Sequence, residues 1–416
     1  MLTRSKLLFA VSAAVAIMPM TRAVAGIDVT AGDWKLDFSG NVNAFYVGTT
    51  CDDGQNTGVV GGLACTGDKS AAVRNGLLPA AFVFSATTRQ DNLDIGVTIG
   101  MYPGINSSAA QGVNGAGLPS ALQTPGIDAR QAFLTFGDAS WGTVKMGRDI
   151  GLFGKDAILD DMTLLGVGSS TNNAAPGNTS LGRIGLGYIY TDWEPQITYT
   201  TPSFSGFSAS AGVFQPLDSG GSASYTKHTA PQVQIGGSYA WGGTDGGMTG
   251  KVWIDFVSQQ MQATAADQAI NGPGAATSVT GNGFDGGVKL GFAGFEGVLY
   301  GYSGTGLGTT GLFILGTSAS GQKRDSDGGY VQASYKINKL KLGLSYGMSE
   351  LKQASDERAL PATELLKRNS SVVGGVYYSL TKSLTLVGEY IHTKADAWNG
   401  NSATEKDFAL GAILFF

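Results

Sequence analysis

The sequence predicts an all-β protein, an antiparallel barrel of sixteen strands that crosses a membrane. Three observations lead to this fold class. Apolar and polar residues alternate through most of the chain, as expected where neighbouring side chains point to opposite faces of a strand. The last stretch ends on an aromatic residue, whereas chain ends in soluble proteins usually fray and are polar. Charged residues make up only 14% of the chain, yet beyond its first residues no apolar run is long enough for a spanning helix. Closed barrels are the other structure that satisfies its backbone in lipid.

The first strand shows the alternation clearly. Trp34, Leu36 and Phe38 share one face, whereas Lys35 and Asp37 share the other. A polar inner face with an apolar outer face is typical of a water-filled barrel surrounded by lipid. Counting such segments predicts strands at residues 33–48, 76–89, 92–102, 128–137, 141–148, 194–201, 206–215, 231–242, 247–260, 283–293, 295–303, 327–338, 340–349, 371–380, 383–393 and 405–416.

The last predicted strand indicates where the barrel resides. One of its faces is entirely apolar up to the final residue, formed by Phe408, Leu410, Ala412, Leu414 and Phe416. Such a strand suits the closing segment of an outer-membrane barrel, which meets lipid with every second side chain. The sequence therefore predicts the outer membrane of a Gram-negative bacterium as the location.

The connections between these strands alternate between short and long. Short ones occur at Gln90-Asp91, Gly294 and Lys339, for example, and the longest connection covers residues 149–193. Outer-membrane barrels have short periplasmic turns and long extracellular loops. The even strand count places both chain ends in the periplasm. No linker interrupts the pattern, so residues 26–416 are expected to form one domain.

Residues 1–25 have the pattern of a secretory signal peptide. Arg4 and Lys6 precede an apolar stretch from Leu7 to Ile17, and Ala23 and Ala25 form a small-x-small cleavage site. Removing this segment lowers the formal charge from −5 to −8. An acidic chain is not expected to bind nucleic acid.

The two cysteines, Cys51 and Cys65, lie in one glycine-rich segment of a chain bound for an oxidising compartment. This setting predicts a disulfide between them. No metal site or cofactor is expected, because His228 and His392 are the only histidines and lie far from the cysteines in sequence.

Enzyme motifs are absent or weak in this sequence. The segment from Gly306 to Gly311 matches a dinucleotide-binding fingerprint by spelling, but no helical pattern follows it, which favours a loop. No Gly-x-Ser-x-Gly turn joins a strand to a helix. The charged stretch 350–368 is interpreted as a loop, with a short helix as the alternative. The chain is therefore not expected to be an enzyme.

Three segments resemble the general Gram-negative porins. Residues 130–133 read RQAF and residues 141–148 read WGTVKMGR, similar to the R-x-A-F and F-G-x-V-x-x-G-R hairpin of that family. Residues 199–207, YTTPSFSGF, resemble its Y-x-S-P-x-F-x-G-F turn. The resemblance implies a homotrimer of sixteen-stranded barrels. Each would be a water-filled pore for passive diffusion of small hydrophilic solutes and ions, narrowed by a third loop folded inward, here 149–193.

The hairpin 128–148 is the one place where clean alternation is lost, which suits strands covered on both faces. A turn centred on Ala139 would place Arg130 directly opposite Arg148, and like charges there need acidic partners. We therefore expect a charged constriction. Its basic residues would be Arg130, Arg148, Arg74 and Arg183, and its acidic residues on the loop would be Asp156, Asp160 and Asp161. The alternative is that the loop carboxylates are solvated or pair locally.

Other functions on the same barrel stay open at this point. A substrate-selective channel for sugars or small anions is the main alternative, with Tyr188, Tyr190 and Trp193 as candidates for stacking sugars. A surface adhesin or anchor is the third. Membrane lipids are expected partners, and basic residues on the outer loops are expected to bridge lipopolysaccharide.

Overall fold

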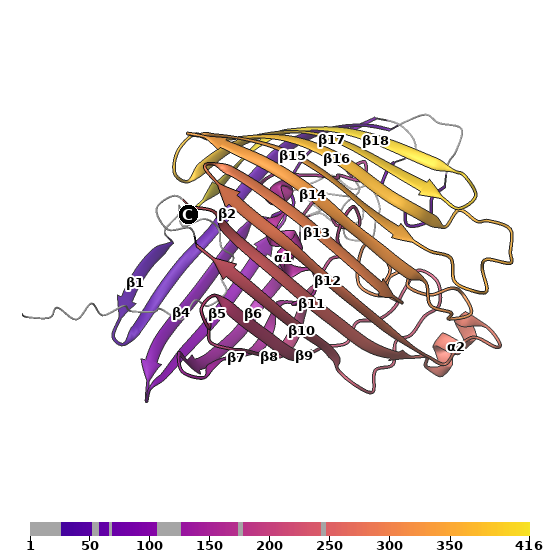
Figure 1. Ribbon diagram of the computed structural model, residues 1–416, viewed down its shortest axis with the longest axis horizontal. Helices are drawn as coiled ribbons and strands as arrows, with labels where there is room; N and C mark the ends of the chain where they lie inside the picture. Colours follow the sequence, from indigo (N-terminus) through magenta and orange to yellow (C-terminus); the bar gives the residue numbers. More distant parts are fainter. Residues whose placement is uncertain (1–25, 52–57, 66–68, 106–125, 174–177, 243–246) are drawn as a thin grey trace, which may run out of the picture.

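The computed structural model describes residues 26–51, 58–65, 69–105, 126–173, 178–242 and 247–416. The strands form one closed antiparallel barrel with short turns at one end and long loops at the other (Figure 1). The strands are β1 (Ile27–Ala31), β2 (Trp34–Cys51), β3 (Ser70–Arg74), β4 (Ala81–Gln90), β5 (Leu93–Pro103), β6 (Ile127–Asp138), β7 (Gly142–Ile150), β8 (Trp193–Thr200), β9 (Phe207–Phe214), β10 (Gln232–Trp241), β11 (Thr249–Gln262), β12 (Ser278–Phe292), β13 (Phe295–Thr305), β14 (Asp325–Ile337), β15 (Leu340–Leu351), β16 (Leu366–Ser379), β17 (Leu384–Ala397) and β18 (Ser402–Phe415).

Helical structure is confined to short segments in the described ranges. These are α1 (Lys155–Asp160), the 3-10 helix η4 (Met162–Leu165) and α2 (Ala265–Asn271). Among the described residues, no helix combines the length and apolar character needed to cross a membrane. The predicted signal peptide, residues 1–25, lies outside the described residues, so the domain boundary at residue 26 stays a prediction.

The barrel has sixteen strand positions, as predicted. β18 closes it by pairing antiparallel with β2, from Glu405 opposite Cys51 to Phe415 opposite Asn41. β3 and β4 pair with different parts of β2 and so share one position. β1 pairs with the first residues of β2 on the side where β18 ends. Neither β1 nor β3 was predicted.

The two faces of the strands follow the predicted alternation. In β18, Phe408, Leu410 and Leu414 are exposed on the outer face, whereas Asp407 and Ala409 are buried inside. The terminal residue is held in the sheet, because Phe416 and Gly40 each donate a backbone hydrogen bond to the other. The outer surface is therefore apolar where lipid would meet it.

Two of the short turns show why the strands reverse at these residues. Asp91 and Asn92 between β4 and β5, and Ala293 and Gly294 between β12 and β13, all have positive φ. A two-residue turn of this kind matches the right-handed twist of the strands it joins.

The strands extend further toward the long loops than predicted. β12 begins five residues earlier than expected, and β16 begins with Leu366-Lys367-Arg368 instead of at residue 371. Beyond the lipid both faces of a strand meet water, so the apolar alternation fades although the backbone pairing continues. Residues 352–365 contain no helix and form a loop.

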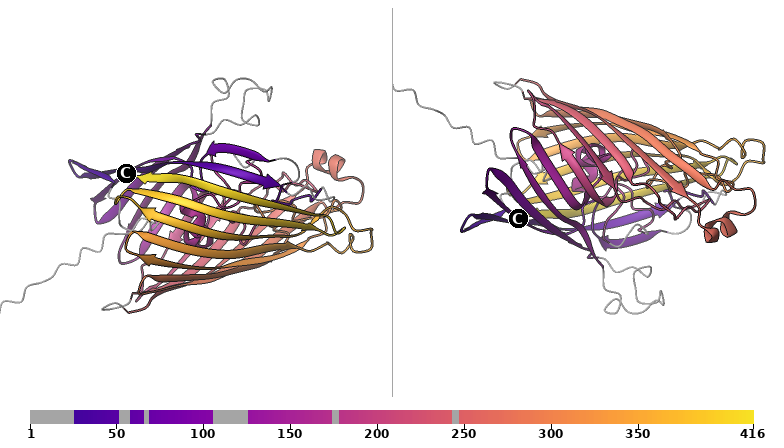
Figure 2. Two further views of the ribbon diagram at one scale, coloured as in Figure 1. Left: turned by 90° about the horizontal axis from the view of Figure 1, so that it is seen from above. Right: turned by 90° about the horizontal axis from the view of Figure 1, so that it is seen from below.

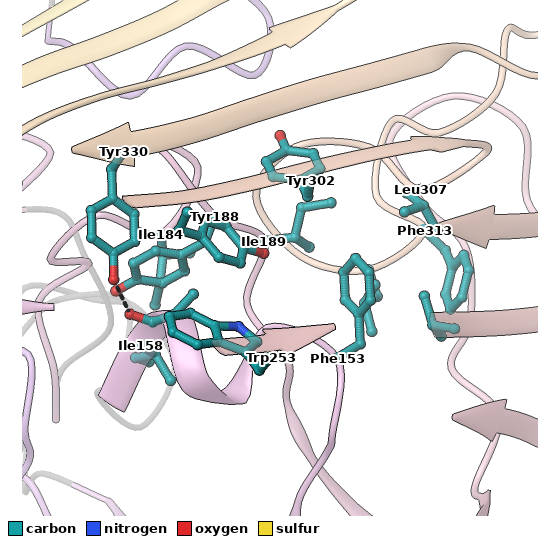
Figure 3. Close-up of a cluster of buried hydrophobic side chains, with 14 of the residues drawn as sticks. Phe153, Ile158, Ile184, Tyr188, Ile189, Trp253, Tyr302, Leu307, Phe313 and Tyr330 are labelled. Atoms are coloured by element: carbon teal, nitrogen blue, oxygen red, sulfur yellow. Dashed lines mark hydrogen bonds between the residues drawn. The ribbon is translucent and has the colours of Figure 1, made fainter. Parts of the chain in front are cut away.

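The interior of the barrel holds its own apolar core. Side chains from the loop after β7, including Phe153, Tyr188 and Ile189, pack against Trp253 and Tyr330 on the barrel wall (Figure 3). α1 lies inside the barrel, whereas α2 lies at the end with the long loops (Figure 2).

Candidate pore and its inward loop

Residues 151–192, which connect β7 to β8, are called the inward loop here. Side-chain oxygens of the barrel wall accept hydrogen bonds from the start of this loop. The N–H groups of Leu152 and Phe153 donate to Oε1 of Gln234 on β10, at 2.6 and 2.9 Å. The N–H of Gly154 donates to Asp285 on β12 at 2.5 Å. Because both acceptors point into the barrel, the loop begins inside the lumen.

The middle of the inward loop is attached in the same way to the next strands. The N–H of Met162 donates to Gln332 on β14 at 2.7 Å. The N–H groups of Val167 and Gly168 donate to Glu389 on β17, at 2.8 and 2.9 Å. Burying backbone donors is favourable only where acceptors meet them, and these wall residues supply the acceptors.

A later part of the loop, at Ser170 and Asn172, reaches the closing strand. Ser170 donates its N–H to Asp407 at 3.2 Å, and Asn172 donates its N–H to Glu405 at 3.1 Å. Glu405 also accepts the N–H of Cys65 at 3.0 Å, so it joins the first loop to the inward loop. The predicted disulfide between Cys51 and Cys65 is present and links this part of the first loop to the end of β2.

Acidic residues of α1 face lysines on the wall. Asp156 pairs with Lys251 at 2.5 Å, and Asp160 pairs with Lys289 at 2.9 Å. The two lysines lie directly opposite each other in the β11–β12 pair, where like charges repel. The two aspartates relieve this repulsion. Burial raises the pKa of Asp160, although Lys289 acts in the opposite direction.

The row of charges continues along the wall toward the short turns. Glu296 lies between Lys289, at 3.1 Å, and Lys341, at 3.6 Å. Pairs that are partly open to solvent contribute little to stability, so these groups matter mainly for the field inside the lumen.

Two of the predicted constriction residues, Asp161 and Arg183, are buried residues of the inward loop itself. Asp161 accepts hydrogen bonds from Thr163 and from the hydroxyl of Tyr188. Arg183 donates to Ser371 on β16. Burial raises the pKa of Asp161 and lowers that of Arg183. Arg183 is not among the cavity-lining residues, and although Asp161 borders the cavity, its carboxylate is engaged in hydrogen bonds within the loop.

Arg74 is also buried between wall and loop, at the end of β3. It donates to the backbone oxygens of Asn75 and Thr179, at 3.3 and 2.6 Å. The structure therefore brings Asp156 and Asp160 to the lumen, whereas Arg74, Arg183 and Asp161 help to fix the inward loop against the barrel wall.

The predicted pairing of Arg130 with Arg148 is wrong. The turn between β6 and β7 centres on Ser140, because Asp138 pairs with Gly142, and Arg148 therefore lies opposite Ala132. Shifting the turn centre by one residue moves the partner by two. Arg148 is exposed on the outer face, with the parity of Met146.

Arg130 lies at an irregularity in the pairing of β5 with β6. It pairs with Asp128 at 3.0 Å, and its guanidinium lies 5.4 Å from the centre of the Tyr102 ring. Tyr102 faces the interior, where it packs against Trp193. Of the two predicted arginines in this hairpin, only Arg130 reaches the inside.

An open cavity of about 1940 Å³ lies beside the inward loop and extends toward the short turns. On the side of β5 to β8 its lining includes Tyr102, Gln131, Lys145 and Asp149. Lys145 and Asp149 form an ion pair, and Gln131 donates to Asp149 at 3.0 Å. This side of the lumen therefore presents polar and charged groups to the cavity.

The aromatic candidates for sugar stacking do not form an open track. Tyr188 is fully buried and meets the Tyr330 ring edge-on at 6.0 Å, as Figure 3 shows for this cluster. Trp193 is also buried. Only Tyr190 among the three is partly exposed.

Sequence reasoning missed Lys251, Lys289 and Lys145 as lumen charges. Lys289 did lie on the polar face of its predicted strand, and this position was the available signal. Nothing in the local sequence distinguished these lysines from others in the same barrel.

Comparisons with known proteins agree with this architecture. A family model described as Gram-negative porin matches residues 9–397. No curated protein matches the chain. The outer-membrane channel DcaP of Acinetobacter baumannii is similar in structure, with a TM-score of 0.66 and 15% identity over 94% of this chain and 100% of that one.

Two further solved structures are similar at the level of fold. OmpF of Salmonella typhi, in a complex with daunomycin, has a TM-score of 0.55 and 14% identity, over 94% of this chain and 100% of that one. OmpT of Vibrio cholerae has a TM-score of 0.55 and 12% identity with the same coverage. With the family match and the barrel, the chain belongs to the Gram-negative porin family and is an outer-membrane channel for passive diffusion.

Proposed function

We propose that small hydrophilic solutes and ions cross the barrel beside the inward loop, along the wall of β5 to β8. The observation that carries this proposal is the attachment of the loop. Its backbone is bonded to side chains of β10, β12, β14, β17 and β18, so it covers that wall, whereas side chains of β5 to β8 line the cavity. The open side is lined by polar groups, among them Gln131, Lys145 and Asp149.

The charges around this passage form the constriction in our proposal. Asp156 and Asp160 on α1 supply its acidic edge, while Lys145 and Arg130 supply basic groups on the hairpin side. Charged side chains on pore walls set ion preference. Arg74, Arg183 and Asp161 act in this proposal by holding the loop that narrows the pore.

A second candidate function is a preference for small anions. The wall from β11 to β17 carries six lysines that line the cavity, Lys251, Lys289, Lys336, Lys339, Lys341 and Lys382. The acidic groups that pair with these lysines are Asp156, Asp160 and Glu296, so basic charge is in excess there. This excess would attract anions on the side of the short turns.

Single-channel recording in a planar bilayer, with the reversal potential under a salt gradient, tests both parts. A diffusion pore conducts salt freely, a selective channel is blocked by its ligand, and an anchor conducts little. Replacing both Lys251 and Lys289 by Gln should shift the reversal potential toward cation preference. Lys406→Gln is the matched control, because Lys406 is exposed on the outer face of β18. An unchanged reversal potential in the double variant would contradict the anion preference.

We also propose a homotrimer. Arg148 lies on the outer face between Ala132 and Pro195 of the neighbouring strands. A charge on the lipid face of a barrel costs roughly 2–4 kcal/mol at the membrane midplane, and contact with a second copy would remove this cost. One of the similar structures, OmpT of Vibrio cholerae, is described as a trimer form. Current steps in groups of three would support the trimer, and single steps throughout would contradict it.

The exposed apolar residues of the outer face would contact membrane lipids in this proposal. Lipopolysaccharide as a partner of the outer loops stays a prediction from the setting.

A further inference from the structure

We propose that the loop between β13 and β14, residues 306–324, is a second narrowing of the pore that limits solute size together with the inward loop. This inference rests on the proposed passage through the lumen. It concerns a loop that the sequence placed outside the barrel, among ordinary surface connections.

The base of this loop lies on the inner face of the wall. Leu307 and Phe313 are almost completely buried. A side chain at Gly283 of β12 would lie 2.2 Å from Leu307, and one at Gly281 would lie 2.7 Å from Phe313. These glycines share the inward parity of Asp285, so both apolar side chains sit inside the barrel. Figure 3 shows Leu307 and Phe313 on the same side of the cluster as Phe153.

The tip of the loop is bonded to the inward loop. The N–H of Tyr190 donates to the carbonyl oxygen of Thr310 at 2.8 Å, and Tyr190 forms a parallel bridge with Gly311. The Thr310 hydroxyl lies where a side chain at Gly185 would be, 2.7 Å from the position of its Cβ. The two loops therefore touch through backbone and side chain inside the lumen.

Two further contacts hold the loop in this position. The N–H of Leu315 donates to the oxygen of Gly220, in the loop between β9 and β10, at 2.7 Å. Arg324 donates to the oxygen of Leu315 at 2.9 Å and pairs with Glu357. Burial opposes the charge on Glu357, but the hydrogen bond from Arg324 lowers its pKa overall. The loop is thus fixed at both sides of its tip.

The two loops narrow the lumen at different depths. Leu307 meets β12 at Gly283, whereas the inward loop meets it from Asp285, which accepts the N–H of Gly154, to Lys289, which pairs with Asp160. Six residues along a strand correspond to roughly 20 Å. A solute arriving from the side of the long loops would pass residues 306–324 before it reaches the charges of α1.

The direct test removes the tip together with the buried Phe313. Gly308 and Ile314 already form a bridge, so deleting residues 309–313 joins two neighbouring backbones. The deletion should raise single-channel conductance and let larger sugars enter liposomes in a swelling assay. The control is a five-residue deletion of 359–363, which are exposed in the loop before β16. It should leave both readouts unchanged.

A second test keeps the loop intact. Ile314 is 47% exposed although its neighbours are buried in the lumen, and Ile270 on α2 is 73% exposed. Labelling Ile314→Cys with a negatively charged thiol reagent should reduce the current, whereas labelling Ile270→Cys should not.

The outcomes separate this inference from the proposed pore. If the unaltered protein conducts, but the tip deletion and the labelled Ile314→Cys both keep its conductance and size limit, residues 306–324 do not narrow the pore. If the unaltered protein fails to conduct, the proposed passage itself is refuted.

Discussion

Glu389 on β17 is the residue whose replacement should displace the inward loop most specifically. Its carboxylate accepts the N–H groups of Val167 and Gly168 and the hydroxyl of Tyr377, the last at 2.7 Å. Replacing it by Ala would leave three buried donors without their acceptor. A side chain at Gly166 would also overlap Glu389, at 2.1 Å, so the glutamate fills the space under the loop.

The expected magnitude follows from these contacts. Each buried donor that loses its acceptor costs about 1–3 kcal/mol. The lower value applies here, because lumen water can reach the donors once the carboxylate is gone. Three donors at about 1 kcal/mol each give about 3 kcal/mol. This corresponds to a roughly 100-fold shift from the seated loop toward a displaced one.

The matched variant is Glu389→Gln. Its amide oxygen can accept both backbone N–H groups, and its NH2 group can donate to the Tyr377 oxygen, since a phenol both donates and accepts. This variant should keep the loop seated.

Hydrogen–deuterium exchange of the peptide around residues 162–170 and single-channel current noise check the prediction. Exchange and noise should rise in Glu389→Ala and stay near those of the unaltered protein in Glu389→Gln. Wild-type behaviour of the alanine variant, or equal disruption by both, would refute the reasoning.

Three further predictions concern the charges and the disulfide. Because burial raises the pKa of Asp160, acidification should protonate it before ordinary exposed aspartates. The charge of Lys289 is then no longer neutralised, and the reversal potential should shift toward anion preference. The variant Asp160→Asn should show this shift already at neutral pH and respond less to acid. Replacing Cys51 and Cys65 together by Ala should lower the free energy of unfolding by about 3 kcal/mol for a loop of this length, measured by thermal unfolding in detergent; an unchanged transition would contradict this. Arg148→Ala should leave the reversal potential unchanged but weaken the trimer in semi-native electrophoresis, and a changed ion preference would instead place Arg148 at the pore.

The barrel itself could be predicted from the sequence because lipid and water act on alternate residues. Val42 and Asn43, or Asp407 and Phe408, differ in polarity since one side chain meets lipid and the next meets the interior. This local rule identified the sixteen strand positions. It did not identify β1 and β3, which are only five residues long.

The register of the β6–β7 hairpin needed the structure. A turn centre one residue away decides whether Arg148 opposes Arg130 or Ala132, and the sequence of the turn does not distinguish the two. The sequence does indicate the face on which Arg148 lies, because Arg148 shares its strand face with the apolar Met146, as an outward-facing residue would. The irregularity that brings Arg130 inside depends on the neighbouring strand β5.

The sequence by itself determined the barrel, the faces of its strands and the cysteine pair, because each follows from alternation or from residues close in the chain. The tertiary structure alone decided which inward polar residues serve the pore and which hold its loops. Gln234 and Glu389 resemble any water-facing residues in the sequence, and only the path of a loop from a distant part of the chain gives them donors to accept. The same reason hid Leu307 and Phe313, whose places exist only where Gly281 and Gly283 leave room on another strand.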